Sequence, residues 1–138
     1  VTLQTDSKIT VQPGVTLTLY GPLNGPGVMT LAGGGTMLLS NRWNYVVSGA
    51  SANGIVAAAG TLNIAGCTLS LDGLATASTG EYVLVDHSAA SGHLAGSAFA
   101  AVNGLTGKWY IDYDGTDAHL DAVVLVLPPP AGTVIIIR

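Results

Sequence analysis

Several short segments of the chain alternate strictly between apolar and polar side chains. The pattern covers Val15–Leu19, Thr61–Ile64, Cys67–Leu71 and Trp109–Tyr113. Because successive side chains of a β-strand point to opposite faces, each segment is predicted to be a strand with one core face and one outer face. No long stretch shows the three-and-four spacing of apolar residues that is typical of a helix. We therefore expect an all-β fold.

A glycine turn followed by a short strand recurs along the chain. It is found at Pro13–Leu17, Gly34–Leu38, Ala59–Leu62 and Ala65–Leu69. Internal repeats of this kind indicate coils that stack and bury a shared core. We predict a right-handed parallel β-solenoid (β-helix-like), or a closely related β-sandwich, over roughly residues 8–72. A charge at Leu17 is expected to prevent folding, since the alternation places this side chain in the core. The side chains expected to point inward are Val15, Leu17, Leu19, Leu38, Leu62, Ile64, Cys67, Leu69 and Leu71.

The C-terminal part of the chain has a different pattern. Gly80–Val85, Trp109–Tyr113 and Leu120–Leu127 are predicted to be longer, more apolar strands. Within the last of them Ala122–Leu127 has no polar residue, which suggests a strand that is covered on both faces. Pro128–Pro130 follows as a stiff spacer. We divide the chain into a single β-solenoid-like domain, residues 1–127, and a Pro-rich spacer with a C-terminal β-strand tail, residues 128–138.

The end of this tail is the predicted self-assembly site. It is uncharged and strongly β-prone, and only Arg138 follows it. Exposed, such a segment is an aggregation hazard, and the three prolines oppose a tight hairpin. We predict that it adds as a strand to an open sheet edge of another copy, head to tail. Two alternatives are a tail that folds back on its own subunit and donation by Val1–Leu3 instead. The residues of the predicted site are Thr133, Val134, Ile135, Ile136 and Ile137.

Asn24–Ile64 resembles the autotransporter-associated β-strand repeat. That family's wording is a series of glycine turns, a Gly-Thr-Leu-x-Leu-Ser strand, an Asn-x-Tyr-x-Gly segment and a closing Ala-Gly-Thr-Leu-x-Ile. Met29 and Met37 stand where leucine is usual, and Leu31 departs from the pattern. The resemblance implies a parallel β-solenoid in an exported protein and supplies no catalytic residue. The matching residues are Gly25, Gly27, Gly33, Gly35, Thr36, Ser40, Asn44, Tyr45, Gly49, Gly60, Thr61, Leu62 and Ile64.

Gly66–Val126 resembles the C-terminal module that often follows such repeats in secreted bacterial proteins. The similar wording lies at Gly80–Leu84, Ser97–Leu105 and Trp109–Tyr113. These matches are glycine turns and strand residues, so they imply architecture rather than chemistry.

The composition favours a protein that associates with itself. Only 9% of the residues are charged while 49% are hydrophobic, and the mean hydropathy is +0.52. Soluble domains usually carry about 25% charged residues, so much of this surface is expected to be covered by contacts. The net charge of −4 and the four scattered basic residues exclude nucleic-acid binding, which needs clustered Lys and Arg. No apolar run is long enough to span a membrane as a helix.

Candidate chemistry is sparse. Asp86-His87-Ser88 holds the residue types of a hydrolase relay, but neighbours on a strand point to opposite faces. Asp112–Asp117 could wrap Ca²⁺ through its aspartates or could form a hairpin turn at Asp114-Gly115. Cys67 has no partner for an intrachain disulfide and is expected to be a small buried residue. A carbohydrate-binding platform, the alternative to core packing for the aromatic residues, would comprise Trp43, Tyr45, Trp109, Tyr110 and Tyr113.

Together these features predict a structural subunit of an extracellular bacterial filament or surface assembly. One alternative is a monomeric adhesin or passenger module that binds a carbohydrate or a host surface. Another is a polysaccharide-degrading β-helix enzyme, which would need clustered acidic and basic residues on one face. We expect no enzyme activity, cofactor or metal. Since the chain begins at Val1, we expect a secreted protein whose signal peptide has been removed.

Overall fold

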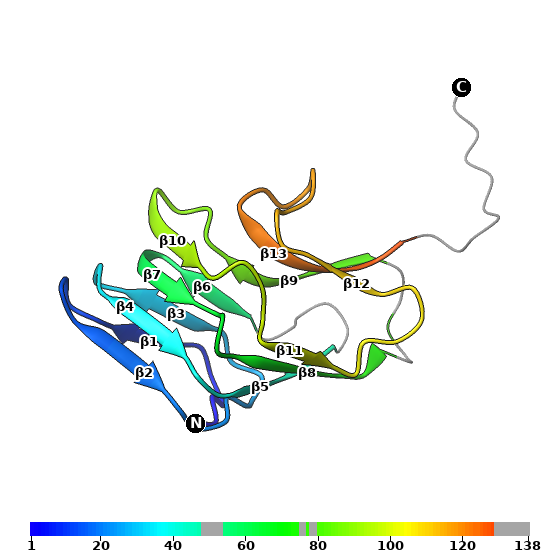
Figure 1. Cartoon of the computed structure of the whole chain (residues 1–138), viewed down its shortest axis with the longest axis horizontal. Helices are drawn as coiled ribbons and strands as arrows, with labels where there is room; N and C mark the ends of the chain where they lie inside the picture. Colours follow the sequence, from blue (N-terminus) through cyan, green and yellow to red (C-terminus); the bar gives the residue numbers. More distant parts are fainter. Residues whose placement is uncertain (48–53, 75–76, 78–79, 129–138) are drawn as a thin grey trace.

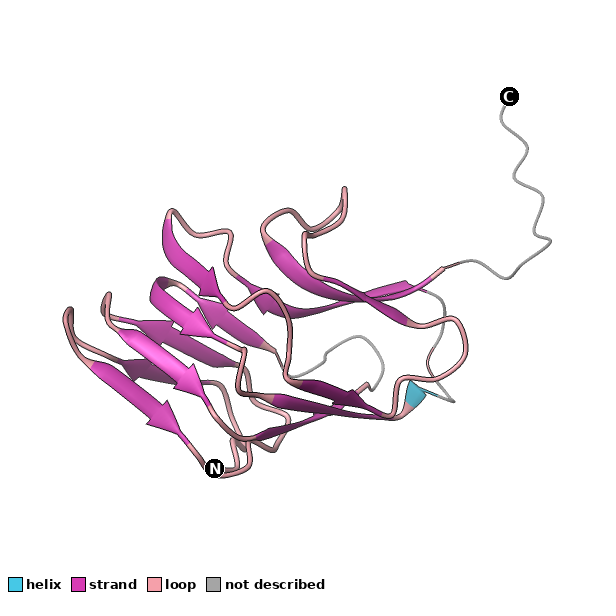
Figure 2. Ribbon diagram, viewed as in Figure 1, coloured by secondary structure: helices cyan, strands magenta, loops and turns pink. Residues whose placement is uncertain are grey.

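The computed structural model describes residues 1–47, 54–74, 77 and 80–128 (Figure 1). Strands make up nearly all of their regular structure, as Figure 2 shows. The all-β prediction is therefore confirmed. The predicted self-assembly site Thr133–Ile137 lies outside the described residues.

The strands form three sheets. The first has, in spatial order, β1 (Ser7–Thr10), β3 (Met29–Ala32), β6 (Ile55–Ala57), β9 (Gly80–Asp86), β13 (Ala122–Leu127) and β12 (Tyr110–Asp112). The second has β10 (Ser91–Ala95), β7 (Ala59–Asn63), β4 (Thr36–Leu39) and β2 (Thr16–Leu19). The third has β11 (Ala101–Asn103), β8 (Thr68–Asp72) and β5 (Arg42–Val46).

The chain visits the three sheets in turn. It runs through β3, β4 and β5, then β6, β7 and β8, then β9, β10 and β11, and each strand pairs in parallel with its counterpart in the preceding round. An earlier round contributes β1 and β2, and Leu23 bridges to Trp43 in the third sheet. Parallel pairing of successive rounds is compatible with the glycine turn and strand that recur in the sequence.

Residues stack in register from one round to the next. In the second sheet Leu17 pairs with Met37, Met37 with Leu62 and Leu62 with Leu94. In the third sheet Trp43 pairs with Leu69, and Leu69 with Val102. Like side chains therefore form columns, and the columns of the three sheets meet in one apolar core.

Glycines at one corner let successive rounds approach closely. Gly92 pairs with Gly60, and Gly35 precedes the neighbouring pair Thr36–Thr61. A Cβ atom on Gly60 would lie 2.3 Å from the Gly35 carbonyl oxygen, and one on Gly92 would lie 1.8 Å from that of Ala57. Gly60 also has a φ of +83°, which L side chains rarely adopt. This corner of the stack therefore requires glycine.

The C-terminal segment closes one end of the first sheet. β13 pairs antiparallel with β9, and β12 pairs antiparallel with β13. Val123 and Leu125 join the main core, while the other face of β13 packs with Val83 in a second apolar cluster. The prediction that Ala122–Leu127 is covered on both faces is confirmed for Ala122 to Val126.

The predicted inward face is partly wrong. Leu62, Ile64, Cys67, Leu69 and Leu71 are buried as expected. Val15 and Leu17, by contrast, are exposed, and Leu19 is only partly buried. Leu17 is in register with the buried Met37, but it belongs to the outermost round, and no described strand lies beyond it.

Leu38 is a second correction, with a different cause. Its neighbours Met37 and Leu39 are buried and Leu38 faces outward, half-buried. Because Met37, Leu38 and Leu39 are all apolar, the sequence does not show which of them point inward. The pairing of Met37 with the buried Leu62 places Met37 and Leu39 on the core side and Leu38 on the outer side.

Candidate functional site

One end of the stack leaves two strand edges open. Among the described strands, β1 pairs only with β3 and β2 pairs only with β4 (Figure 1). In the third sheet the same end is closed by the chain itself, because Leu3 N–H donates to Asn24 O and Asn24 N–H donates to Val1 O. The segment Val1–Leu3, an alternative strand donor from the sequence, is therefore engaged within its own chain.

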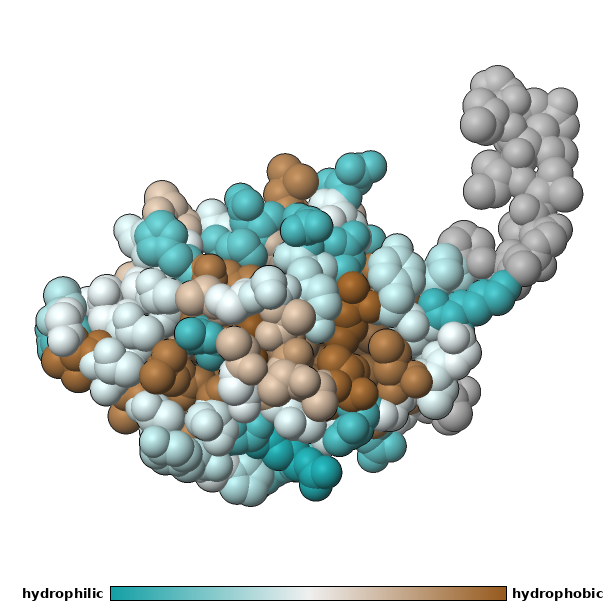
Figure 3. All heavy atoms as spheres, in the orientation of Figure 1, coloured by the Kyte–Doolittle hydropathy of each residue, from teal (hydrophilic) through white to brown (hydrophobic). Residues whose placement is uncertain are grey.

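Apolar side chains gather at this open end. Val1, Val15, Leu17 and Tyr20 are 52%, 50%, 40% and 75% exposed, which is half of the large hydrophobic residues that are exposed among the described residues. Figure 3 shows hydrophobic atoms at the surface around the first strands, and a further area near the connection from β11 to β12. Contiguous exposed apolar surface on a folded domain marks an interaction site.

The other end of the stack is packed more completely. Phe99 lies 6.1 Å from Trp43 between ring centroids, and Trp109 lies 5.9 Å from Tyr82. Both Phe99 and Trp109 are buried in the main core. The two ends of the molecule thus differ: Leu17 at the edge of β2 is 40% exposed, whereas Leu94 and Val102, at the described edges β10 and β11, are partly buried against the core.

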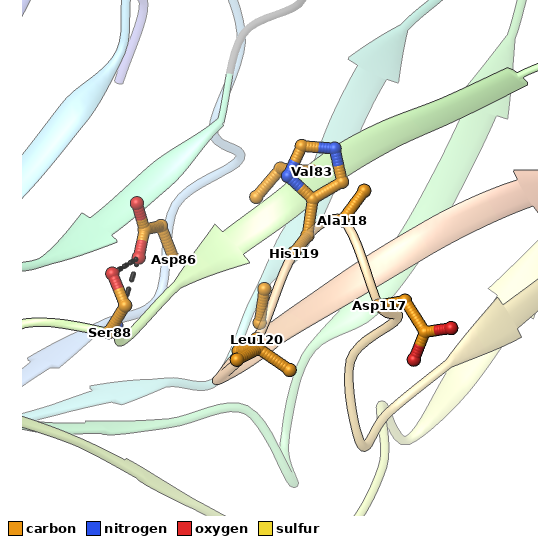
Figure 4. A pocket seen from close by; sticks show the side chains of 8 residues that line it. Val83, Asp86, Ser88, Asp117, Ala118, His119 and Leu120 are labelled. Atoms are coloured by element: carbon orange, nitrogen blue, oxygen red, sulfur yellow. Dashed lines mark hydrogen bonds between the residues drawn. The ribbon is translucent and has the colours of Figure 1, made fainter.

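A hollow of the described surface lies elsewhere, beside β9 and β13. It has a volume of about 380 Å³ and is lined by Val83, Asp86, Ser88, Asp117, Ala118, His119, Leu120 and Ala122 (Figure 4). The Asp86 carboxylate accepts hydrogen bonds from the Ser88 hydroxyl at 2.6 Å and from the Ser88 N–H at 2.9 Å. These bonds lower the pKa of Asp86, because both favour the ionised carboxylate.

The hollow does not assemble a hydrolase relay from its described residues. The Ser88 hydroxyl donates its hydrogen bond to the Asp86 carboxylate, not to a histidine base. His119 lies 3.7 Å from the Glu81 carboxylate, and in Figure 4 its ring lies beside Val83, away from Ser88. His87 and His93 line a second hollow with Ser88 and Asp121. Asp86 and Ser88 therefore come together as a turn, and among the described residues neither side chain forms a hydrogen bond with a histidine side chain.

The aspartate-rich segment forms a turn. Asp114 N–H donates to the Asp112 carboxylate at 2.9 Å, Gly115 has a φ of +85°, and Gly115 bridges to Leu120 on the way from β12 to β13. Backbone hydrogen bonds between Thr116 and His119 form the tip. Of the two sequence interpretations the turn is the one the structure shows. Within the described ranges, no three His, Cys, Asp or Glu side chains gather as a group able to hold a metal ion.

The aromatic residues do not form a carbohydrate-binding platform, so this alternative is wrong. Trp43, Tyr45 and Trp109 are buried, and Trp43 packs edge-on against Tyr45 with 5.7 Å between ring centroids. Burial raises the pKa of the Tyr45 phenol well above its usual range. Of the five, only Tyr110 is largely exposed. Flat aromatic surface for stacking on a sugar is therefore not presented by these residues.

Cys67 behaves as a small core residue, as predicted. It is fully buried, and burial raises the pKa of its thiol to about 12. A thiol held in its protonated form is a poor nucleophile and a poor metal ligand.

Comparisons with known proteins give no relative: no family model, no curated protein and no solved structure matches the chain. In the part of the chain that the structure describes, no helix is long and apolar enough to cross a membrane.

The open end was missed by reasoning from sequence. Its signal was present, because residues 11–20 contain no charged side chain although they include a turn and a strand that the structure leaves at the surface. Alternation marks Leu17 as core-facing but says nothing about whether a further strand lies beyond it.

Proposed function

We propose that this chain is a parallel β-solenoid that serves as a structural subunit of an extracellular bacterial assembly. Subunits join when the C-terminal strand Thr133–Ile137 of one copy adds to an open sheet edge of the next. The observation that carries the proposal is the open end of the stack, where β1 and β2 are unpaired on one side and four large apolar side chains are exposed.

Strand addition explains how such an end and such a tail fit together. An open edge presents free N–H and C=O groups, and natural proteins rarely leave one bare. An added strand satisfies those groups, and its side chains fill the apolar surface beside the edge. The tail supplies uncharged, β-branched residues for this role, and consecutive prolines such as those at positions 128–130 favour an extended chain.

The charge-poor composition and the resemblance to autotransporter-associated repeats support the same proposal. With 9% charged residues, the chain is suited to having its surface covered by neighbours. The repeat family is architectural and exported, which supports a secreted, non-enzymatic role.

Removal of the tail tests the proposal. The full chain, whose monomer mass is 13.8 kDa, is expected to form polymers whose mass grows with concentration. A chain without Gly132–Arg138 is expected to remain a monomer, lighter than the full-length one, in light scattering after size-exclusion chromatography. Negative-stain microscopy of the same samples should show fibres only for the full chain. Equal polymers from both chains contradict strand donation by the tail. A full chain that stays monomeric at high concentration contradicts the assembly itself and favours the adhesin alternative.

A further inference from the structure

We infer that the acceptor of the donated strand is the open edge of β2, and that the donor comes from a second copy rather than from the same chain. This inference rests on the proposed function and deepens it, since it names which of the open edges receives the tail.

Charge and apolar exposure together separate β2 from the other open edges. β1 carries the exposed Lys8, and β12 contains Asp112. Charged side chains on edge strands oppose pairing with another chain. The remaining edges β2, β10 and β11 have no Lys, Arg, Asp or Glu. Among these three, Leu94 of β10 and Val102 of β11 are partly buried against the core, whereas Leu17 of β2 is 40% exposed. β2 is therefore the uncharged described edge whose core-facing side chain is most exposed, which is expected of an edge that is covered in the working assembly.

The side chains beside β2 are those of an incomplete core. Leu17 and Leu19 pair with Met37 and Leu39, which are fully buried. Leu17 itself is 40% exposed because its column stops there. A donated strand next to β2 would extend this column by one side chain. Whichever face of the segment Thr133–Ile137 points toward the core, the side chains on that face are apolar, except for Thr133. The tail therefore matches what the end of the column lacks.

The end of β13 lies far from the outermost round of the same chain. β13 lies four strand positions from β1, which is about 19 Å at about 4.8 Å per strand. There is also an offset along the strand direction. Leu127 pairs with Gly80 of β9, which lies five residues before Val85. Val85 is the residue of β9 that is in register, through Ile55 and Met29, with Ser7 of β1, so the offset between Leu127 and Ser7 is about 17 Å along the strands.

The two offsets combine to about 25 Å from Leu127 to Ser7 of β1, in the outermost round. The six steps from Leu127 to Thr133 span at most about 22 Å when fully extended. Figure 1 shows β13 ending on the side of the molecule opposite to β2. These distances favour the tail of a second copy as the strand that pairs with β2.

Two complementary full-length variants test the acceptor. An acceptor variant, Leu17→Lys, places a charge in the open column, and a donor variant carries Ile135→Asp and Ile136→Asp. Each alone is expected to be monomeric by analytical ultracentrifugation. The acceptor variant keeps its tail and the donor variant keeps its β2 edge. Mixed in equal amounts, the two are therefore expected to form a complex of two chains, in which the tail of the acceptor variant pairs with β2 of the donor variant. This complex has no further intact tail or β2 edge, so it cannot grow. The matched control Tyr110→Lys, which puts the same charge on the open edge of β12, is expected to polymerise like the unchanged chain.

The outcomes separate the inference from the proposed function. If the donor variant is monomeric but Leu17→Lys polymerises, or if Tyr110→Lys is the variant that blocks polymers, the tail is a donor and β2 is not its acceptor. If the donor variant still polymerises, or the unchanged chain never does, the proposed function fails and the inference with it. Circular dichroism and thermal unfolding check that Leu17→Lys is folded. Should it not be, Thr16→Lys, at an exposed position of the same strand, replaces it.

Discussion

At the scale of single residues, position in the stack decides what a side chain contributes. Leu17 and Leu62 belong to one column and have the same chemistry. Leu62 is fully buried because rounds lie on both sides of it, whereas Leu17 is 40% exposed at the end. We therefore expect a charge at Leu62, rather than at Leu17, to prevent folding.

Truncation of these two leucines should give very different losses. Leu62→Ala is expected to lower the free energy of unfolding by about 2–5 kcal/mol, as for other core leucines. Leu17→Ala should cost less than about 1 kcal/mol, since much of its side chain is already in water. Urea unfolding of both changes in the donor-variant background, where assembly does not contribute, measures the difference. Equal losses would mean that the open end is packed like the core.

The Asp86–Ser88 turn gives a pH dependence of known sign. The pKa of Asp86 is lower in the folded chain than its usual value of about 4 in an unfolded one. The carboxylate therefore stabilises the fold above about pH 4, and this contribution is lost as the pH falls below that value toward the lowered pKa.

Ser88→Ala removes the hydroxyl bond that lowers this pKa most. The variant is expected to lose less stability than the unchanged chain when urea unfolding is compared at pH 5 and pH 3. Parallel losses in the two proteins would show that the Ser88 hydroxyl does not stabilise the Asp86 carboxylate.

At the scale of elements, close approach at one corner explains why glycine stands near the start of β4, β7 and β10. Gly60 and Gly14 have nearly the same φ, +83° and +80°. A Cβ on Gly60 would collide with the Gly35 carbonyl, whereas a Cβ on Gly14 would meet nothing within 4 Å. Both glycines therefore carry the backbone requirement of a positive φ, but only Gly60 also lies where a Cβ atom would collide with the neighbouring round.

Alanine at these two glycines should show that difference. Gly14→Ala is expected to cost about 1 kcal/mol from backbone strain alone. Gly60→Ala should cost at least about 2 kcal/mol more, because the rounds must move apart. Thermal and urea unfolding of both variants provide the comparison. Similar losses would contradict the requirement for close contact between rounds at this corner.

The strands themselves were largely predictable from alternation, and their surroundings were not. Thr61–Ile64 and Cys67–Leu71 alternate without ambiguity, and their inward residues are buried. Thr36–Leu39 holds three adjacent apolar residues, so its phase depends on the neighbouring strands. The contact of Asp86 with Ser88 escaped the rule for strand neighbours because β9 ends at Asp86 and the chain turns there.

At the scale of the whole molecule, the two ends of the stack are unlike. The hairpin of β12 and β13 extends the first sheet at one end, with buried aromatic residues beneath it. The other end stops at β1 and β2 with its columns exposed. Alternation could not reveal this, because the alternation within a strand is the same whether or not another strand follows. A molecule with an exposed apolar edge at β2 and an apolar tail is suited to head-to-tail addition.

Hydrogen exchange at β2 tests this account most directly. Amides of Thr16–Leu19 that do not bond to β4 have no strand partner in the isolated chain, and they gain one if the tail of another copy pairs there. We predict that they exchange slowly in polymers of the full chain and rapidly in the monomeric donor variant, while amides of the interior strand β7 are equally protected in both. Equal exchange at Thr16–Leu19 in polymer and monomer would contradict strand addition at the open end.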